Sequence, residues 1–219
     1  MILYGAPVSP YVRKVMVFCA EAGISFQLKP TRPHSTNPDF CAASPFGRIP
    51  AINDDGYCLA DSSAIVHYLH ARHGTSLIPA DPKELGRVVW FDEVGDTVLF
   101  GAMQPIFWNR VVMPVLNRQP GDEAAADKAE KEALPPVLDW LETIIPQSDF
   151  LLGDTLTLAD VAIASPMANY RHIYGSVDPA RYPRIAAYVD RMFARPSIAT
   201  LFAGECETLA TARAKAGLT

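Results

Sequence analysis

The pattern of hydrophobic residues changes near residue 80, and this change constrains the fold more than any other feature of the sequence. Before it, short apolar runs of strand length alternate with stretches in which apolar residues recur at helical spacing. After the proline-rich segment 77–82, strand-like runs largely disappear and helical spacing remains. We therefore predict an α/β domain over residues 1–78, a linker over 79–84 and an all-helical domain over 85–219.

The first domain is predicted to have the element order β-α-β-α-β-β-α. Turn residues Asn-Asp-Asp-Gly at 53–56 separate two short apolar runs, which is a strong hairpin signal. The predicted elements are a strand at 2–4, a helix from Ser9 to Gly23, a strand at 24–28, a short helix at 38–43, strands at 49–52 and 57–59, and a helix from Asp61 to Gly74.

The second domain is predicted to consist of helices only. Pro105 and Pro114 are expected to kink or end the helix around them. Thr157 and Asp160 stand three residues apart before an apolar run, which predicts a capping box with a structural role. The helical windows lie at 84–107, 122–145, 157–171, 183–195 and 197–216.

Charge and composition exclude several classes of protein. The formal net charge is -5 and there is no basic run, which argues against nucleic acid as a partner. No stretch reaches the ~18 apolar residues of a membrane helix, and no basic segment precedes the apolar start as in a signal peptide. We therefore expect a soluble, cytoplasmic protein with no membrane partner. Its free thiols are expected to be Cys19, Cys41, Cys58 and Cys206, which form no C-x-x-C pair.

Three histidines spaced three residues apart, His67, His70 and His73, invite a metal hypothesis. On a helix, residues three and six apart drift around the axis, and no acidic partner completes a ligand set. We expect no metal site here.

Ser9 precedes Pro10 at the start of the first predicted helix. Proline suits the first helical position, so Ser9 falls at the N-cap. A helix N-terminus carries about half a positive charge, and a hydroxyl there can donate to a bound anion such as a thiolate. Ser9 is therefore either a simple cap or a residue that stabilises a bound anion.

Two further segments lie at element ends in the same domain. Pro50 begins a predicted interior strand, where proline implies either a cis bond or an exposed edge, unless it is an ordinary loop proline. With a cis bond, the backbone of Ile49 could pair with an extended peptide. Asp61 and Ser62 open a helix and are either an N-cap or groups that hold an amine and a carboxylate. A ligand with a thiol, a peptide bond, an amine and carboxylates would use all three segments.

That ligand is glutathione, and the chain resembles the glutathione S-transferases over essentially its whole length. The resemblance is to serine-type, bacterial-like cytosolic members, because Ser9, Ile49-Pro50 and Asp61-Ser62 match their glutathione-binding positions. The run Leu-Gly-Asp-Thr-Leu-Thr-Leu-Ala-Asp at 152–160 resembles the family's C-terminal motif, with Asp in place of the usual Glu. The resemblance implies a thioredoxin-like domain that binds glutathione and a helical domain that contributes the pocket for a small hydrophobic electrophile.

The resemblance also implies roles for individual residues. Ser9 is the expected catalytic hydroxyl, and Tyr4 is the alternative because tyrosine-type classes keep their hydroxyl near that position. The expected glutathione-binding residues are Ser9, His34, Arg48, Ile49, Pro50, Asp61 and Ser62, and the expected electrophile pocket is lined by Tyr11, Met103, Phe107 and Arg110. Arg110 is of interest there because a buried guanidinium could bind an anionic co-substrate.

The expected function is glutathione transfer by a homodimer, with glutathione as co-substrate. Serine at position 9, where thiol-transferring relatives carry cysteine, disfavours disulfide exchange. The absence of the Ser-Ser-Cys run of zeta-type isomerases weakens an isomerase assignment. The alternatives are a glutathione-dependent lyase, dehalogenase or isomerase, or a non-catalytic interaction protein on the same scaffold.

Overall fold

The structure, a computed structural model, describes residues 1–218 and separates the chain into two units, Met1–Val88 and Val89–Thr219. The first contains the sheet and three helices, and the second is helical, so the predicted sequence of an α/β part and an all-helical part is confirmed. Helix α4 (Pro82–Glu93) begins inside the predicted linker and crosses the division at Val88. The change from one unit to the other is therefore made within a helix.

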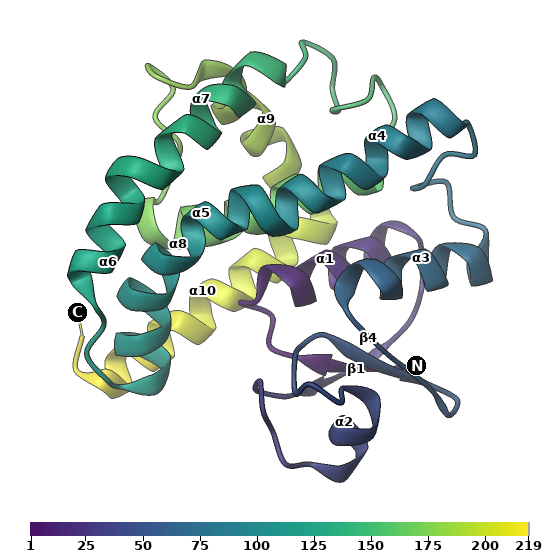
Figure 1. The fold of residues 1–219 in the computed structure, drawn as a ribbon, viewed down its shortest axis with the longest axis horizontal. Helices are drawn as coiled ribbons and strands as arrows, with labels where there is room; N and C mark the ends of the chain where they lie inside the picture. The colour runs from purple at the N-terminus through teal and green to yellow at the C-terminus, as the bar shows by residue number, and fades with distance from the viewer. Residues whose placement is uncertain (219) are drawn as a thin grey trace. The chain divides into compact units, whose positions relative to one another are not determined.

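A four-stranded mixed sheet forms the centre of unit 1 (Figure 1). Its order is β2-β1-β3-β4, with β1 parallel to β2 and antiparallel to β3, and β3 antiparallel to β4. The strand β2 starts three residues later than the run at 24–28 predicts, because its pairing with β1 begins at Gln27. The strands are β1 (Ile2–Gly5), β2 (Gln27–Pro30), β3 (Ala51–Asp54) and β4 (Tyr57–Ala60).

Helices cover both faces of this sheet. In Figure 1, α1 (Pro10–Glu21) and α3 (Ser62–His73) lie side by side on one face, and the short α2 (Pro38–Ala43) lies on the other. Side chains alternate between the faces of a strand, and Tyr4 of β1 packs towards α2, with ring centroids 6.0 Å from Phe40. The predicted order β-α-β-α-β-β-α is the observed one.

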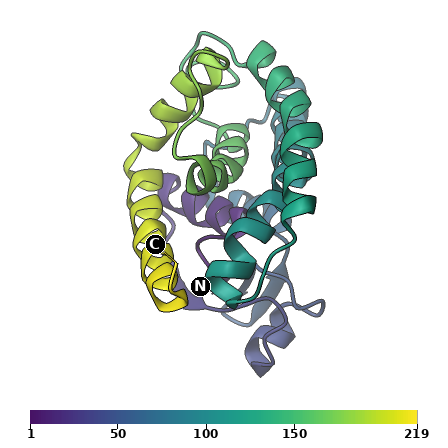
Figure 2. The same ribbon diagram turned by 90° about the vertical axis from the view of Figure 1, so that its left-hand side faces the viewer.

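Unit 2 is built around helix α8 (Leu158–Tyr174), whose first thirteen residues, Leu158 to Tyr170, are all buried. In Figure 2, this green helix lies between α9 and α10 on one side and the teal helices on the other. Trp90 of α4 packs edge-to-face on Trp140 of α7, with centroids 5.6 Å apart. The other helices are α5 (Phe100–Phe107), α6 (Glu123–Lys128), α7 (Leu134–Ile144), α9 (Pro183–Phe193) and α10 (Pro196–Ala216).

Three segments of unit 2 are π-helical: η1 (Val94–Leu99), η2 (Trp108–Asn117) and η3 (Ala129–Ala133). Pro105 lies inside α5 and Pro114 inside η2, so neither proline ends the helix. The wider turns of η2 adjust the hydrogen bonding beyond Pro105, and the Asn109 side chain donates to the Pro105 carbonyl at 2.9 Å. The prolines thus change the local winding and leave the helix continuous.

The predicted capping box at the start of α8 is confirmed. The Thr157 side chain accepts from the third helical residue, and the Asp160 side chain accepts from the Thr157 N–H at 3.0 Å. Within residues 1–218, no helix combines the length and apolar character needed to cross a bilayer.

Candidate active site

Ser9 stands at the N-cap of α1, directly before Pro10. Its backbone is fixed on both sides, because its N–H donates to the Ala6 carbonyl at 3.0 Å and its carbonyl accepts from Arg13 at 2.9 Å. Its side chain makes no capping hydrogen bond, although the position is that of a cap. The half-buried hydroxyl therefore has a fixed position at the positive end of a helix dipole without serving the helix itself.

The Ile49–Pro50 peptide bond is cis, one of the three alternatives that the sequence leaves open for this proline. Strand β3 begins at Ala51, so half-buried Ile49 lies just outside the ladder of the sheet. The preceding loop is held by Ser44, whose hydroxyl accepts from the Arg48 N–H at 2.9 Å and donates to the Arg48 carbonyl at 2.7 Å. The Arg48 backbone is thus fixed while its side chain is exposed.

His34 lies beside this loop. Its backbone N–H donates to the Gly47 carbonyl at 2.7 Å, and an added Cβ on Gly47 would come within 2.9 Å of His34 Nδ1. Gly47 has a positive φ of 66°, so glycine is needed there both for the backbone conformation and for the close approach. This bond joins exposed His34 to Gly47, the residue directly before Arg48 in the sequence.

Asp61 is the N-cap of α3, and its side chain accepts from the Ser63 N–H at 3.0 Å. Asp61 has a φ of 83°, a conformation that costs energy for a residue with a side chain and that is typical of functional sites. Ser62 is buried and Asp61 is exposed. The first turn of α3 therefore presents a carboxylate, two hydroxyl-bearing residues and helix-terminal N–H groups together.

The sheet register gathers these segments at one end of unit 1. Tyr4 near the end of β1 pairs with Ala51 at the start of β3, and Ala51 pairs with Ala60 at the end of β4. Gly5 pairs with Pro30, the last residue of β2. The segments that follow or precede these strand ends are the ones that carry Ser9, His34, Ile49-Pro50 and Asp61-Ser62.

Tyr4 is 1% exposed and belongs to a hydrophobic cluster with Phe40, Ala43 and Ala51. Its ring centroid is 6.0 Å from that of Phe40, and the Lys29 ammonium lies 5.5 Å from the Tyr4 ring. A side chain packed this way is part of the core of unit 1. This arrangement favours Ser9 over Tyr4 as the thiol-activating hydroxyl.

The residues expected in the electrophile pocket divide between the two units. Tyr11 lies half-buried on α1 in unit 1, whereas Met103 and Phe107 lie buried on α5 in unit 2. Arg110 belongs to η2, and its guanidinium donates to three carboxylates, those of Glu123, Asp127 and Glu130, at 2.6, 2.7 and 3.0 Å.

These ion pairs count against the expected role of Arg110 as a binding site for an anionic co-substrate. Burial opposes the charge, but the hydrogen bonds that the guanidinium donates to Glu123 and Glu130 outweigh it and raise the pKa of Arg110. Glu130 also accepts from the Tyr174 hydroxyl. Lys131 pairs with Asp127 as well, at 3.1 Å, so the cluster has three carboxylates against two cations and its net negative charge disfavours a bound anion.

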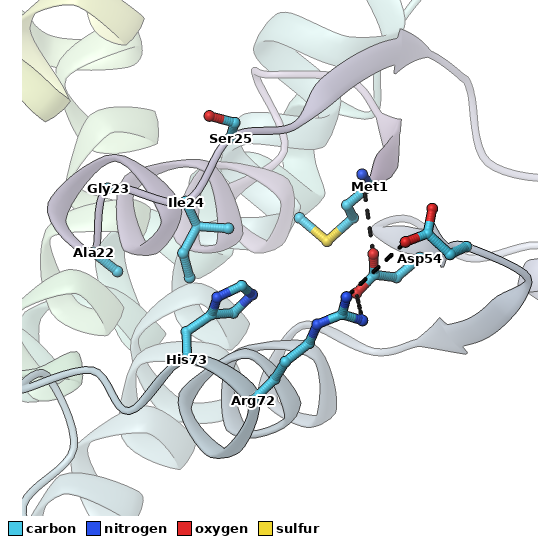
Figure 3. A pocket seen from close by; sticks show the side chains of 9 residues that line it. Met1, Ala22, Gly23, Ile24, Ser25, Asp54, Arg72 and His73 are labelled. Atoms are coloured by element: carbon cyan, nitrogen blue, oxygen red, sulfur yellow. Dashed lines mark hydrogen bonds and ion pairs between the residues drawn. The ribbon is translucent and has the colours of Figure 1, made fainter.

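A different pocket, of about 420 Å³, lies at the opposite end of unit 1 (Figure 3). It is lined by residues before β1, after α1, in the β3–β4 hairpin and at the end of α3. Its charges pair internally, because Asp54 accepts from Arg72 and from the Tyr68 hydroxyl at 2.9 Å, and lies 4.0 Å from the Met1 ammonium. The pocket therefore presents little unbalanced charge to a ligand.

The histidines considered for metal binding lie on α3, where the His70 ring nitrogen Nδ1 lies 3.0 Å from the Thr75 hydroxyl. Among the described residues, no group of three histidine, cysteine or acidic side chains has an arrangement that could hold a metal ion. All four cysteines are free.

One residue of this region was not singled out from the sequence. Lys14 of α1 is fully buried, and its Nζ donates to the Ser63 hydroxyl at 3.1 Å. The two residues are 49 positions apart, so no local pattern indicates the contact. Nine of the twelve residues of α1 are buried. The helix therefore has no broad exposed face with which the burial of Lys14 could be contrasted in the sequence.

Comparison with known proteins gives two matches to domain families. Residues 3–77 match the model of the glutathione S-transferase N-terminal domain, and residues 108–204 match that of the C-terminal domain. The two matches lie within the α/β and helical parts respectively.

Individual relatives match along most of the chain. Glutathione S-transferase 3 of Zea mays is 34% identical over 203 residues, covering 89% of this chain and 90% of its own. A glutathione S-transferase of Hyoscyamus muticus is 31% identical over 207 residues, covering 90% and 95%.

Solved structures agree. Glutathione transferase F7 from Populus trichocarpa has a TM-score of 0.80 at 29% identity, covering 93% of this chain and 98% of its own. Glutathione S-transferase-I bound with lactoylglutathione has a TM-score of 0.81 at 26% identity, covering 92% and 98%. With matches to both domains, in order, and relatives that span nearly the whole length, the chain belongs to the glutathione S-transferase family.

Proposed function

We propose that this protein is a glutathione transferase in which the Ser9 hydroxyl stabilises the glutathione thiolate. The observation that carries the proposal is the position of Ser9 at the start of α1, where its hydroxyl makes no capping bond. The cis Ile49–Pro50 bond and the Asp61–Ser62 turn belong to the same end of unit 1. These are the positions at which the sequence matches the family's glutathione site.

The chemistry starts from a free thiol with a pKa of ~8.5, which is mostly protonated at neutral pH. A hydrogen bond from Ser9 to the sulfur and the positive end of α1 both favour the thiolate, and each pKa unit is worth about 1.4 kcal/mol. The thiol proton passes to solvent, and the sulfur electron pair then forms a bond to an electrophilic carbon. A leaving group departs with its electron pair, or a double bond accepts the charge.

The other site residues bind the rest of glutathione. The Ile49 backbone pairs with the cysteinyl backbone as a short added strand. Asp61 receives the γ-glutamyl amine, and Ser62 with the N–H groups of α3 receives its carboxylate. Arg48 and His34, whose N–H is bonded to the carbonyl of Gly47, supply the contacts for the glycyl carboxylate.

We further propose that Tyr11, Met103 and Phe107 contact the electrophile, which is small and hydrophobic. The chemistry of these side chains suits an apolar substrate. Arg110 contributes to the structure of the helices near these residues, because its ion pairs with Glu123, Asp127 and Glu130 connect η2 to α6 and η3.

The central test is Ser9→Ala with Ser25→Ala as the matched control, because Ser25 is exposed near the far end of unit 1. We expect Ser9→Ala to lower kcat with an activated chloroarene by about 100-fold, the usual effect of removing one donor to a developing anion. The dissociation constant for glutathione should change by much less. Equal kcat in the Ser9→Ala variant and the wild type would remove Ser9 from its role.

The main alternative is a non-catalytic interaction protein with the same fold. Retention on immobilised glutathione, together with turnover of an electrophile panel, separates the two. We expect the column to retain the wild type. The Asp61→Ala variant should pass through it, because the γ-glutamyl amine loses its carboxylate partner. Binding without turnover of any electrophile would favour the interaction protein. Products from an elimination, a halide release or an isomerisation would identify the lyase, dehalogenase or isomerase alternative.

We also propose that the protein acts in the cytoplasm as a homodimer. The free state of all four cysteines supports a reducing compartment. Exposed aromatic side chains, of which Phe46 at 83% is the most accessible among those described, support association with a second copy.

A further inference from the structure

Lys14 is a buried cation that joins the two helices bearing the proposed glutathione site. It lies on α1, five residues after Ser9, and its side chain is fully buried. Its Nζ is 3.1 Å from the hydroxyl of Ser63, the second residue of α3. The two helices lie side by side in unit 1 (Figure 1), and this bond connects their N-terminal halves.

Ser63 in turn holds Asp61. The Ser63 N–H donates to Asp61 Oδ1 at 3.0 Å while its hydroxyl accepts from Lys14. Asp61 has a φ of 83°, and such a conformation persists only when surrounding contacts hold it. The chain Lys14–Ser63–Asp61 therefore sets the position of the first turn of α3 relative to α1.

We propose that Lys14 is a positioning residue for the γ-glutamyl end of glutathione, acting through Ser63. The inference rests on the proposed transferase function and assigns a role that the sequence pattern does not indicate. Lys14 holds the Asp61–Ser62–Ser63 turn at a fixed distance from Ser9, so that the turn is in place to receive the γ-glutamyl end. The sulfur end of glutathione depends on Ser9 and is not affected directly.

The test uses Lys14→Met, Ser63→Ala and the double variant in the full chain. Methionine keeps the shape of the lysine stem but removes the ammonium. We expect Lys14→Met to raise the dissociation constant of glutathione, measured by calorimetry, about tenfold, the size expected for a hydrogen bond to a charged group. Ser63→Ala should raise it by a smaller factor, and the double variant should match Lys14→Met because both changes remove the same contact.

Two further readouts separate positioning from a general structural role. At saturating glutathione, kcat and the pH profile of kcat should stay at wild-type values, because the environment of the thiol is unchanged. With cysteinylglycine, which lacks the γ-glutamyl residue, kcat/KM should be the same in Lys14→Met and wild type. Lys83→Met, the same substitution at an exposed site on α4, is the control and should bind glutathione as the wild type does.

The outcomes distinguish this inference from the proposed function. Failure of the wild type to bind or use glutathione overturns both. Suppose that the wild type binds and uses glutathione. If Lys14→Met and Ser63→Ala then both bind glutathione within twofold of the wild type, the inference alone is overturned. A lower kcat with unchanged affinity for glutathione overturns it as well. If Lys14→Met does not fold, the test uses Ser63→Ala and Ser63→Thr. Weaker glutathione binding by Ser63→Ala that is restored in Ser63→Thr supports the role of Lys14. Unchanged glutathione binding by Ser63→Ala overturns it.

Discussion

The thiol of Cys19 lies on the inner side of α1 and is completely buried. Desolvation by burial raises its pKa to about 12. The thiolate is the reactive form of cysteine, so Cys19 is unreactive for two reasons at once, lack of access and lack of charge. Cys41 and Cys206 are exposed, although burial and the nearby Glu205 raise the pKa of Cys206.

Alkylation should therefore reveal the difference between these thiols. With iodoacetamide at pH 8, we expect Cys41 to be modified in the folded protein while Cys19 stays unmodified until denaturant is added. Because the Cys19 pKa of about 12 lies well above the assay pH, raising the pH from 7 to 9 should leave it protected. Peptide mass spectrometry in native and denatured samples measures this, and native labelling of Cys19 would contradict the assigned burial.

Single residues also show how far the sequence predicts the site. Ser9, Ile49-Pro50 and Asp61-Ser62 could be chosen as candidates because they lie at element ends, where local backbone rules apply, and their role in binding stays a prediction. The Lys14–Ser63 contact and the pairing of Arg110 with Glu130 could not be predicted, since they join residues 49 and 20 positions apart. Such contacts depend on how helices pack, and a single sequence does not record that packing.

At the scale of elements, Asp160 connects the start of α8 to two other segments. Its buried carboxylate accepts from the Leu151 N–H at 2.8 Å, from the Thr157 N–H at 3.0 Å and from the Tyr188 hydroxyl at 3.1 Å. It therefore fixes the preceding loop and α9 as well as capping its own helix. The sequence predicts the cap, because that pattern is local, but not the bond to Tyr188.

Asp160→Ala should destabilise the protein strongly, because four buried donors, the three above and the Thr157 hydroxyl at 3.2 Å, lose their acceptor. We expect a loss of about 3–5 kcal/mol in the free energy of unfolding, measured in urea. Asp154→Ala, at an exposed position in the preceding loop, is the control and should fall within about 0.5 kcal/mol of the wild type. A loss below about 1 kcal/mol for Asp160→Ala would mean that the network contributes little.

Gly121 marks a second close contact between elements. A Cβ at this position would overlap the carbonyl oxygen of Asn109, and the Asn109 side chain accepts from the neighbouring Asp122 N–H at 2.9 Å. The segment before α6 thus runs directly against η2.

Gly121→Ala should therefore cost at least about 2 kcal/mol, since backbone must move to admit the methyl group. Gly204→Ala on α10 has nothing within 4 Å of the added atom, so there we expect no loss and a gain of up to about 1 kcal/mol from helix propensity. Thermal unfolding of both variants checks the pair. A tolerated Gly121→Ala would show that the loop can move away from η2.

Elements with strong periodicity were predictable, whereas those set by their neighbours were not. The helices of unit 2 follow the apolar spacing, but Pro105 and Pro114 lie within continuous helix, where π-helical turns follow or surround them and the Asn109 side chain donates to the Pro105 carbonyl. The start of β2 depends on where β1 pairs with it, at Gln27. Local propensity does not determine either result.

On the scale of the whole molecule, the exposed side chain of Phe46 bears on association. It is 83% exposed, in the loop before the cis Ile49–Pro50 bond. Removing this much aromatic surface from water is favourable in free energy, so covering the ring with a second chain would stabilise an association.

Light scattering should give twice the chain mass of 23.9 kDa for the wild type if the proposed homodimer forms. We expect Phe46→Ser to shift the mass towards that of one chain at micromolar concentration, because the apolar contact is lost. Tyr57→Ser, which changes another exposed aromatic residue of the same unit, tests whether the effect belongs to Phe46. A wild type that elutes as a single chain would contradict the dimer.

The placement of Trp90 against Trp140 has a practical consequence for spectroscopy. The chain has three tryptophans, and the remaining one, Trp108, also lies in unit 2. Intrinsic tryptophan fluorescence is therefore an optical signal of the helical unit alone. Cys19, buried in unit 1, gives a separate chemical signal. Following both during one denaturant titration would show whether the two units of the chain unfold together or in sequence.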